Sequence, residues 1–215
     1  LLSVREDAKN ASGTIASSLQ KAGFNVNPSL VRYYDSIGTT IGQETVEFSR
    51  EVDESLDVYN GAAVVVLSRE GGEGADNERV LEEPEDNLYG DEESAFKHKA
   101  LAHGSWVDGG FVYDESSETE YKHYHQLTES EGALIKYVES KFDKVIVVLN
   151  SSSAFEMYNL EQDEKINAIL LMQRPGETGT LAVGEILNGT VNPSGHLVDE
   201  WAVDFTADPT WYNFG

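Results

Sequence analysis

The stretch that decides the fold is the apolar run Ala62-Ala63-Val64-Val65-Val66-Leu67. Its residues do not alternate with polar ones, as they would in a strand with one face in water. The run therefore predicts a strand buried on both faces. The same pattern recurs at residues 145–149 (VIVVL) and 168–172 (AILLM). Because such strands are typical of parallel sheets, we expect residues 64–66 and 146–148 to lie buried in neighbouring or near-neighbouring strands.

Helical patterns surround these runs. A first helix is expected to begin near Ser12, a second to cover about residues 44–58, and a last one to run from about Thr178 to Leu187. A further helix should begin at Thr128, where the sequence Thr-Glu-Ser-Glu fits a capping box closed by Glu131. Strands that alternate with helices predict an α/β fold, a mainly parallel sheet sandwiched between helices.

Two local signals lie between the first two expected helices. Gly23 is expected to end the first helix. Residues 24–26 (FNV) favour a short strand, and Asn27-Pro28 is typical of a turn. We therefore expect the chain to change direction here.

Length and composition limit the possible functions. The 215 residues, 40% of them hydrophobic, fit a single α/β domain over residues 1–215 with a sizeable core. The 39 acidic and 15 basic side chains give a net charge of −24, so we expect neither nucleic acid nor a membrane as partner. No apolar run approaches the ~20 residues that cross a bilayer. The lack of cysteine excludes disulfides and thiol nucleophiles but leaves the cellular compartment open.

A long loop is expected between Asn77 and Gln126. Its roughly 50 residues far exceed an ordinary connection of about 2–6 residues. Loops of this length are usually functional or disordered. Simple disorder is disfavoured by seven aromatic residues: Tyr89, Phe96, Trp106, Phe111, Tyr113, Tyr121 and Tyr124. We therefore expect the loop to be functional, and we expect a C-terminal extension at residues 201–215.

The sharpest candidate site follows the first apolar run and reads Gly71-Gly72-Glu73-Gly74-Ala75-Asp76. Ligands of open α/β sheets bind at the carboxyl ends of the strands, and glycines let the backbone approach a ligand closely. Three interpretations are open: a tight turn with solvated acids, a phosphate-binding loop, and a carboxylate held for proton transfer. Phosphate is disfavoured because Glu73 and Asp76 lie inside the segment and no lysine is near.

Three further candidates have ordinary structural explanations. His123 and His125 can both bind a metal only from an extended segment, and packing is their favoured role. Ser151, Ser152 and Ser153 follow a strand without the Gly-x-Ser-x-Gly pattern of serine hydrolases, which favours a polar loop. Arg174 follows the third apolar run and either lines a site or forms a turn with Pro175-Gly176. We expect no metal and no cofactor.

Several short segments follow one another along the chain: residues 64–69 (VVVLSR), 72–76 (GEGAD), 144–150 (KVIVVLN), 173–179 (QRPGETG), 188–197 (NGTVNPSGHL) and 208–215 (DPTWYNFG). In this order they resemble the second domain of glycoside hydrolase family 3. The resemblance covers about residues 12–215, and the order of the segments makes it specific although each is weak alone. The last segment also looks like bacterial members of the family.

The resemblance implies one domain of a two-domain retaining β-glycosidase. A (β/α)8 barrel, which we do not find in this sequence, supplies the aspartate nucleophile of such an enzyme. By position Glu73 is then the general acid/base. Implied partners are the barrel and a β-linked glucoside or oligosaccharide. The candidate substrate-binding residues are Gly72, Gly74, Asp76, Trp106 and Arg174.

Two alternatives to a catalytic domain stay open. One is a non-catalytic domain that binds sugar or scaffolds a partner. The other is a flavodoxin-like nucleotide binder, which the acidic loop at residues 70–76 disfavours.

Overall fold

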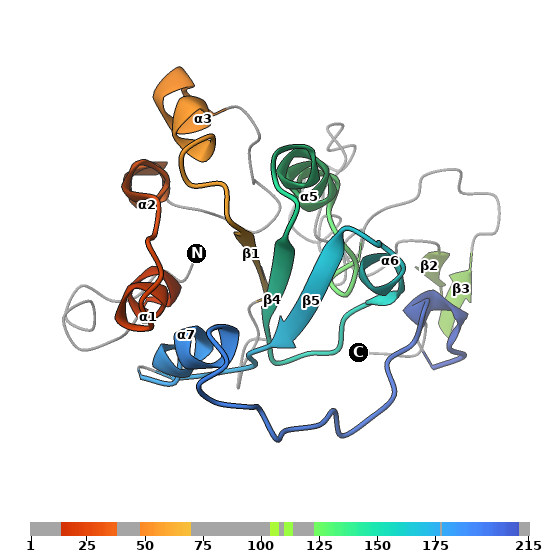
Figure 1. The fold of residues 1–215 in the computed structure, drawn as a ribbon. Coiled ribbons are helices and arrows are strands. Elements are labelled where there is room, and N and C mark those ends of the chain that lie inside the picture. The colour runs from red at the N-terminus through yellow and green to blue at the C-terminus, as the bar shows by residue number, and fades with distance from the viewer. Residues whose placement is uncertain are drawn as a thin grey trace.

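The structure is a computed structural model that describes residues 14–37, 48–69, 104–107, 110–113, 123–176 and 178–210. A parallel sheet with helices around it forms the centre of the molecule (Figure 1). This arrangement confirms the predicted α/β fold. In chain order the elements are α1 (Ile15–Lys21), α2 (Pro28–Ile37), α3 (Arg50–Leu56), β1 (Ala63–Arg69), β2 (Gly104–Val107), β3 (Gly110–Tyr113), α5 (Glu129–Lys141), β4 (Val145–Ser151), α6 (Tyr158–Glu161), β5 (Ile166–Leu171), α7 (Leu181–Leu187) and a 3-10 turn, η1 (Phe205–Ala207).

The main sheet has the order β1-β4-β5, and both pairs of strands are parallel. Val64 lies opposite Ile146 and Val66 lies opposite Val148. The two apolar runs are therefore in neighbouring strands, as the sequence predicts. Strands β2 and β3 form a separate antiparallel pair inside the segment expected to be a loop.

Burial differs between the three strands. The central strand β4 is buried on both faces: Val147 and Val148, whose side chains point to opposite faces, are each 0% exposed. In β1 the burial alternates, with Val65 buried and Val66 half-buried. In β5 Ala168 is exposed, so the prediction of burial on both faces is wrong for this run. The reason is position, since β1 and β5 are the outer strands of the described sheet and have one neighbour each.

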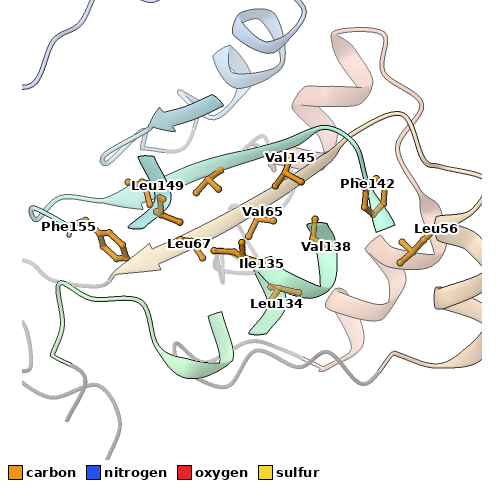
Figure 2. Close-up of a cluster of buried hydrophobic side chains, with 12 residues drawn as sticks. Leu56, Val65, Leu67, Leu134, Ile135, Val138, Phe142, Val145, Leu149 and Phe155 are labelled. Atoms are coloured by element: carbon orange, nitrogen blue, oxygen red, sulfur yellow. The ribbon is translucent and has the colours of Figure 1, made fainter. Parts of the chain in front are cut away.

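Helix α5 packs its apolar stripe on one face of the sheet (Figure 2). Leu134, Ile135 and Val138 are all buried there. The predicted capping box is also present, with Thr128 as N-cap and Glu131 as its partner. The core between α5 and the sheet also contains Leu56, Val65, Leu67, Phe142, Val145, Val147, Leu149, Phe155 and Leu160.

Helices α1 and α7 lie side by side (Figure 1). Ser18 of α1 is buried at their contact, where its Oγ donates to the carbonyl oxygen of Leu181 and accepts from the amide of Gly184. Helix α1 is capped by Thr14, whereas Ser12 lies outside the described residues. Helix α7 is followed by Gly189 at φ 79°, the left-handed position expected after its C-cap.

The segment around residues 24–58 differs from the sequence predictions. Residues 24–26 form no strand, and Asn27-Pro28 begins helix α2 instead of a turn. Asn27 caps this helix through its Oδ1, which accepts from the amide of Ser29, and proline suits the first helical position. The helix expected at 44–58 is the shorter α3, with Ser49 as its N-cap. No helix within the described ranges is long and apolar enough to span a bilayer.

Candidate active site

The candidate site lies at the carboxyl edge of the sheet, where β1 ends at Arg69 and β4 ends at Ser151. Glu73 is four residues beyond Arg69. Chain length alone therefore keeps its Cα within roughly 14 Å of the Cα of Arg69. The end of β1 thus limits where Glu73 can lie. Four predicted site residues fall outside the described residues: Gly72, Glu73, Gly74 and Asp76.

Two other predicted site residues lie on described elements. Trp106 is in β2, and its side chain is outside the described atoms. Arg174 follows β5 at the same sheet edge and is exposed. It lies between Gln173 at φ 51° and Gly176 at φ 65°, two left-handed backbone positions. Contact of Trp106 or Arg174 with a ligand stays a prediction.

The buried guanidinium of Arg69 has a hydrogen-bond acceptor for every N–H group. Nε donates to the carbonyl oxygen of Tyr124 (2.8 Å), Nη1 to that of Ser68 (2.8 Å) and Nη2 to that of Gln126 (2.5 Å). Nη1 and Nη2 also donate to the two carboxylate oxygens of Glu131 at 2.6 and 2.7 Å. These contacts use all the donors of a guanidinium group. The end of β1 is therefore held in one orientation.

Glu131, which is 0% exposed, is shared between Arg69 and the start of α5. Its Oε2 accepts from the amide of Thr128 (2.9 Å), and the amide of Glu131 donates to Oγ1 of Thr128 (3.0 Å). The guanidinium carbon of Arg69 lies 4.9 Å from the centre of the Phe155 ring. Opposite charge, hydrogen bonds and an aromatic face together offset the removal of two charges from water. The pair ties β1 to α5 at the site.

His123, His125 and Glu156 connect the same edge to the loop after β4. His123 is buried, with Nε2 at 3.1 Å from Oε1 of Glu156. Nδ1 of His125 lies 2.6 Å from the carbonyl oxygen of Ala154. Burial alone would raise the pKa of Glu156, but hydrogen bonds from His123 and from the amide of Phe205 outweigh it, so this pKa lies below its usual value. Burial lowers the pKa of His125. Both histidines have the expected packing role.

Ser151, the last residue of β4, begins a polar loop with Ser152 and Ser153, as the sequence favours. Oγ of Ser151 donates to the carbonyl oxygen of Ser153 and accepts from its amide. Ser151 is buried and engaged in this turn. In the part of the chain that the structure describes, no three His, Cys, Asp or Glu side chains are grouped to hold a metal ion.

Sequence reasoning missed the buried Arg69–Glu131 pair. One signal was available, because Arg69 continues the inward-facing series of Val65 and Leu67 at a period of two residues. A charged residue at a buried position needs a partner of opposite charge. The partner itself was not predictable, since 62 positions separate the two residues and Glu131 already has a local role in the capping box.

Comparison with known proteins gives a family match over nearly the whole chain. Residues 5–214 match the family model described as "Glycosyl hydrolase family 3 C-terminal domain". The chain therefore belongs to glycosyl hydrolase family 3 and corresponds to its C-terminal domain.

The similar proteins are much longer than this chain. Beta-glucosidase A of Butyrivibrio fibrisolvens is 28% identical over 156 residues, which are 73% of this chain and 16% of that protein. Beta-D-xylosidase 3 of Arabidopsis thaliana is 37% identical over 57 residues, 26% of this chain and 7% of that protein. A solved beta-glucosidase from Paenibacillus barengoltzii shares the fold, with a TM-score of 0.63 and 21% identity over 94% of this chain and 19% of its own. The chain thus spans about a sixth of the first of these relatives.

Proposed function

We propose that this domain supplies Glu73 as the general acid/base of a retaining β-glycosidase, and that a separate barrel domain supplies the nucleophile. The observation that carries the proposal is the position of Glu73. It lies between glycines, four residues beyond the end of a strand, in a family 3 domain. Ligands of open α/β sheets bind at this edge, and the flanking glycines leave room for a substrate beside the carboxyl group.

The proposed reaction needs two carboxyl groups about 5–5.5 Å apart. In the first step the nucleophile attacks the anomeric carbon, and Glu73 gives its proton to the departing oxygen. In the second step the Glu73 carboxylate takes a proton from water. The water oxygen then attacks the anomeric carbon, and the bond to the nucleophile breaks. Both carboxyl groups return to their starting states.

The proposed substrate is a β-linked glucoside or oligosaccharide cleaved at its terminal sugar. The names beta-glucosidase and beta-D-xylosidase among the relatives support a β-linked sugar. In this account the barrel makes most contacts with the cleaved sugar. Gly72, Gly74 and Asp76 lie near Glu73 in the chain and are proposed to line the site with it. Trp106 is proposed to bind the leaving group, and Arg174 is proposed to line the site.

Substitution of Glu73 in the full-length protein tests the proposal. Glu73→Ala should slow cleavage of a glycoside with a poor leaving group by roughly 10²–10⁴-fold, because the leaving oxygen needs a proton. The glycosylation step with an activated dinitrophenyl glycoside should change little. Glu70→Ala, which removes a neighbouring acid, is the matched control and should have no such selectivity.

Equal, modest losses on both substrates would contradict the assignment. Such a result with Glu73→Ala and a selective loss with Glu70→Ala or Asp76→Ala would move the role to that residue. A full-length protein that binds sugar but hydrolyses neither substrate would support the non-catalytic alternative.

A further inference from the structure

We infer that the Arg69–Glu131 pair is a positioning device for the acid/base loop. This inference rests on the proposed role of Glu73. Arg69 is the last residue of β1, and Glu73 follows it by four positions in the chain. The place at which this strand end is held is therefore the fixed point from which the carboxyl group must reach the substrate.

The strand end needs such an anchor because β1 is an outer strand of the described sheet. Its last residue pairs with Ser151 of β4. Ends of outer strands open more easily than central strands, because few contacts hold them. In β1 the last side chain turns inward and bonds to the segment before α5 and to α5 itself. The anchor thus holds β1 at the side where the described part of the sheet has no further strand.

The chemistry of the Arg69–Glu131 pair suits orientation of the strand end better than stabilisation of the fold. Replacing both members of a buried ion pair by uncharged groups is often neutral or stabilising, so stability alone is weak grounds for one. A guanidinium instead offers a rigid, planar set of donors, and a lysine cannot reproduce it. All five donors of Arg69 are used, to one carboxylate and three carbonyl oxygens. Phe155, which is 0% exposed, covers the guanidinium and keeps water out.

The effect on catalysis follows from geometry. A general acid must lie within hydrogen-bond reach of the departing oxygen. A displacement of about 1 Å can slow a reaction about 10²-fold. If Arg69 fixes the loop, its loss should therefore slow the steps that need Glu73 and spare those that do not.

Arg69→Lys in the full-length protein tests this directly. We expect hydrolysis of a glycoside with a poor leaving group to slow by about 10²-fold. Glycosylation by an activated dinitrophenyl glycoside should slow by only about 3-fold or less. The matched control is Arg50→Lys, which alters an exposed pair with Glu54 and should change neither rate. Equal losses on both substrates, in proportion to the folded fraction, would show a purely structural role and overturn the inference.

A double variant separates position from stability. Arg69→Met with Glu131→Gln removes both charges but leaves an amide oxygen to accept from Thr128. It should melt below the wild-type temperature, because the carbonyl oxygens of Ser68, Tyr124 and Gln126 lose their donor. Per folded molecule it should still lose activity selectively on the poor leaving group. Wild-type rates from this variant would overturn the inference, because uncharged packing would then suffice. Glu73→Ala is measured beside the double variant. If Glu73→Ala shows no selectivity between the two substrates, the proposed function is refuted. If Glu73→Ala is selective but the Arg69 variants are not, only the positioning role is refuted.

Discussion

Helices α1 and α7 touch at Gly184, and Gly184→Ala tests how closely they are packed. A Cβ built on Gly184 would lie 2.3 Å from the carbonyl oxygen of Ser18 and 2.7 Å from its carbonyl carbon. Both are backbone atoms, so no side-chain rotation can relieve the contact. The two helices must therefore move apart by roughly 1 Å to reach an ordinary contact distance.

The expected loss of stability combines three contributions. Forcing extra volume into a packed contact costs about 1–3 kcal/mol. Separation of the helices stretches the two hydrogen bonds of Ser18, to Leu181 and from Gly184, now 2.8 and 2.7 Å. Each contributes about 1 kcal/mol. Alanine in a helix returns about 1 kcal/mol relative to glycine. The net result is a destabilisation of about 2–4 kcal/mol, or roughly 4–16 °C in melting temperature for a domain of this size.

Thermal unfolding followed by circular dichroism measures the effect. The control is Gly132→Ala in α5, where no atom lies within 4 Å of the added Cβ. The same substitution there should raise the free energy of unfolding by up to about 1 kcal/mol. If Gly184→Ala melts at or above the wild-type temperature, the close contact between α1 and α7 is not real.

Three further predictions use other parts of the molecule. The pKa of Glu156 is below its usual 4.5 in the folded state, so its stabilisation is present above that pH and is lost as the pH falls through the lowered value. Glu156→Gln should therefore flatten the acid limb of a plot of unfolding free energy against pH; an unchanged limb would contradict this. Trp106→Ala in the full-length protein should weaken binding of longer glucosides more than of aryl glucosides, whereas equal losses with a lower melting temperature would indicate packing. The isolated chain should not hydrolyse an aryl β-glucoside, because the proposed nucleophile belongs to another domain, and turnover that survives purification would refute the two-domain account.

Much of the fold was predictable because its signals are local. The runs at residues 64–66 and 146–148 have no polar interruption, and they form neighbouring parallel strands. The capping box at Thr128 needs only a spacing of three residues. Helix α2 was missed because Asn27-Pro28 is compatible with both a turn and a helix start. The exposure of β5 was missed because an apolar run does not reveal its place in the sheet.

The candidate site was predictable only where sequence and family resemblance coincide. Glu73 stands out because glycines flank it after an apolar run. The support beneath it depends on contacts between residues far apart in the chain. Arg69 bonds to Glu131 across 62 positions and to the carbonyl oxygen of Tyr124 across 55 positions. No periodicity or motif encodes such contacts, because they arise from the packing of β1 against α5 and against the segment that precedes it.

The central claim is that Glu73 is the general acid/base, and azide rescue of Glu73→Ala tests it most directly. In the full-length variant an activated dinitrophenyl glycoside should still glycosylate the nucleophile, but the second step should stall because no base activates water. Azide needs no base, so it should restore turnover and give a β-glycosyl azide, identified by nuclear magnetic resonance. If azide changes neither the rate nor the product, Glu73 is not the acid/base and the account is wrong at its centre.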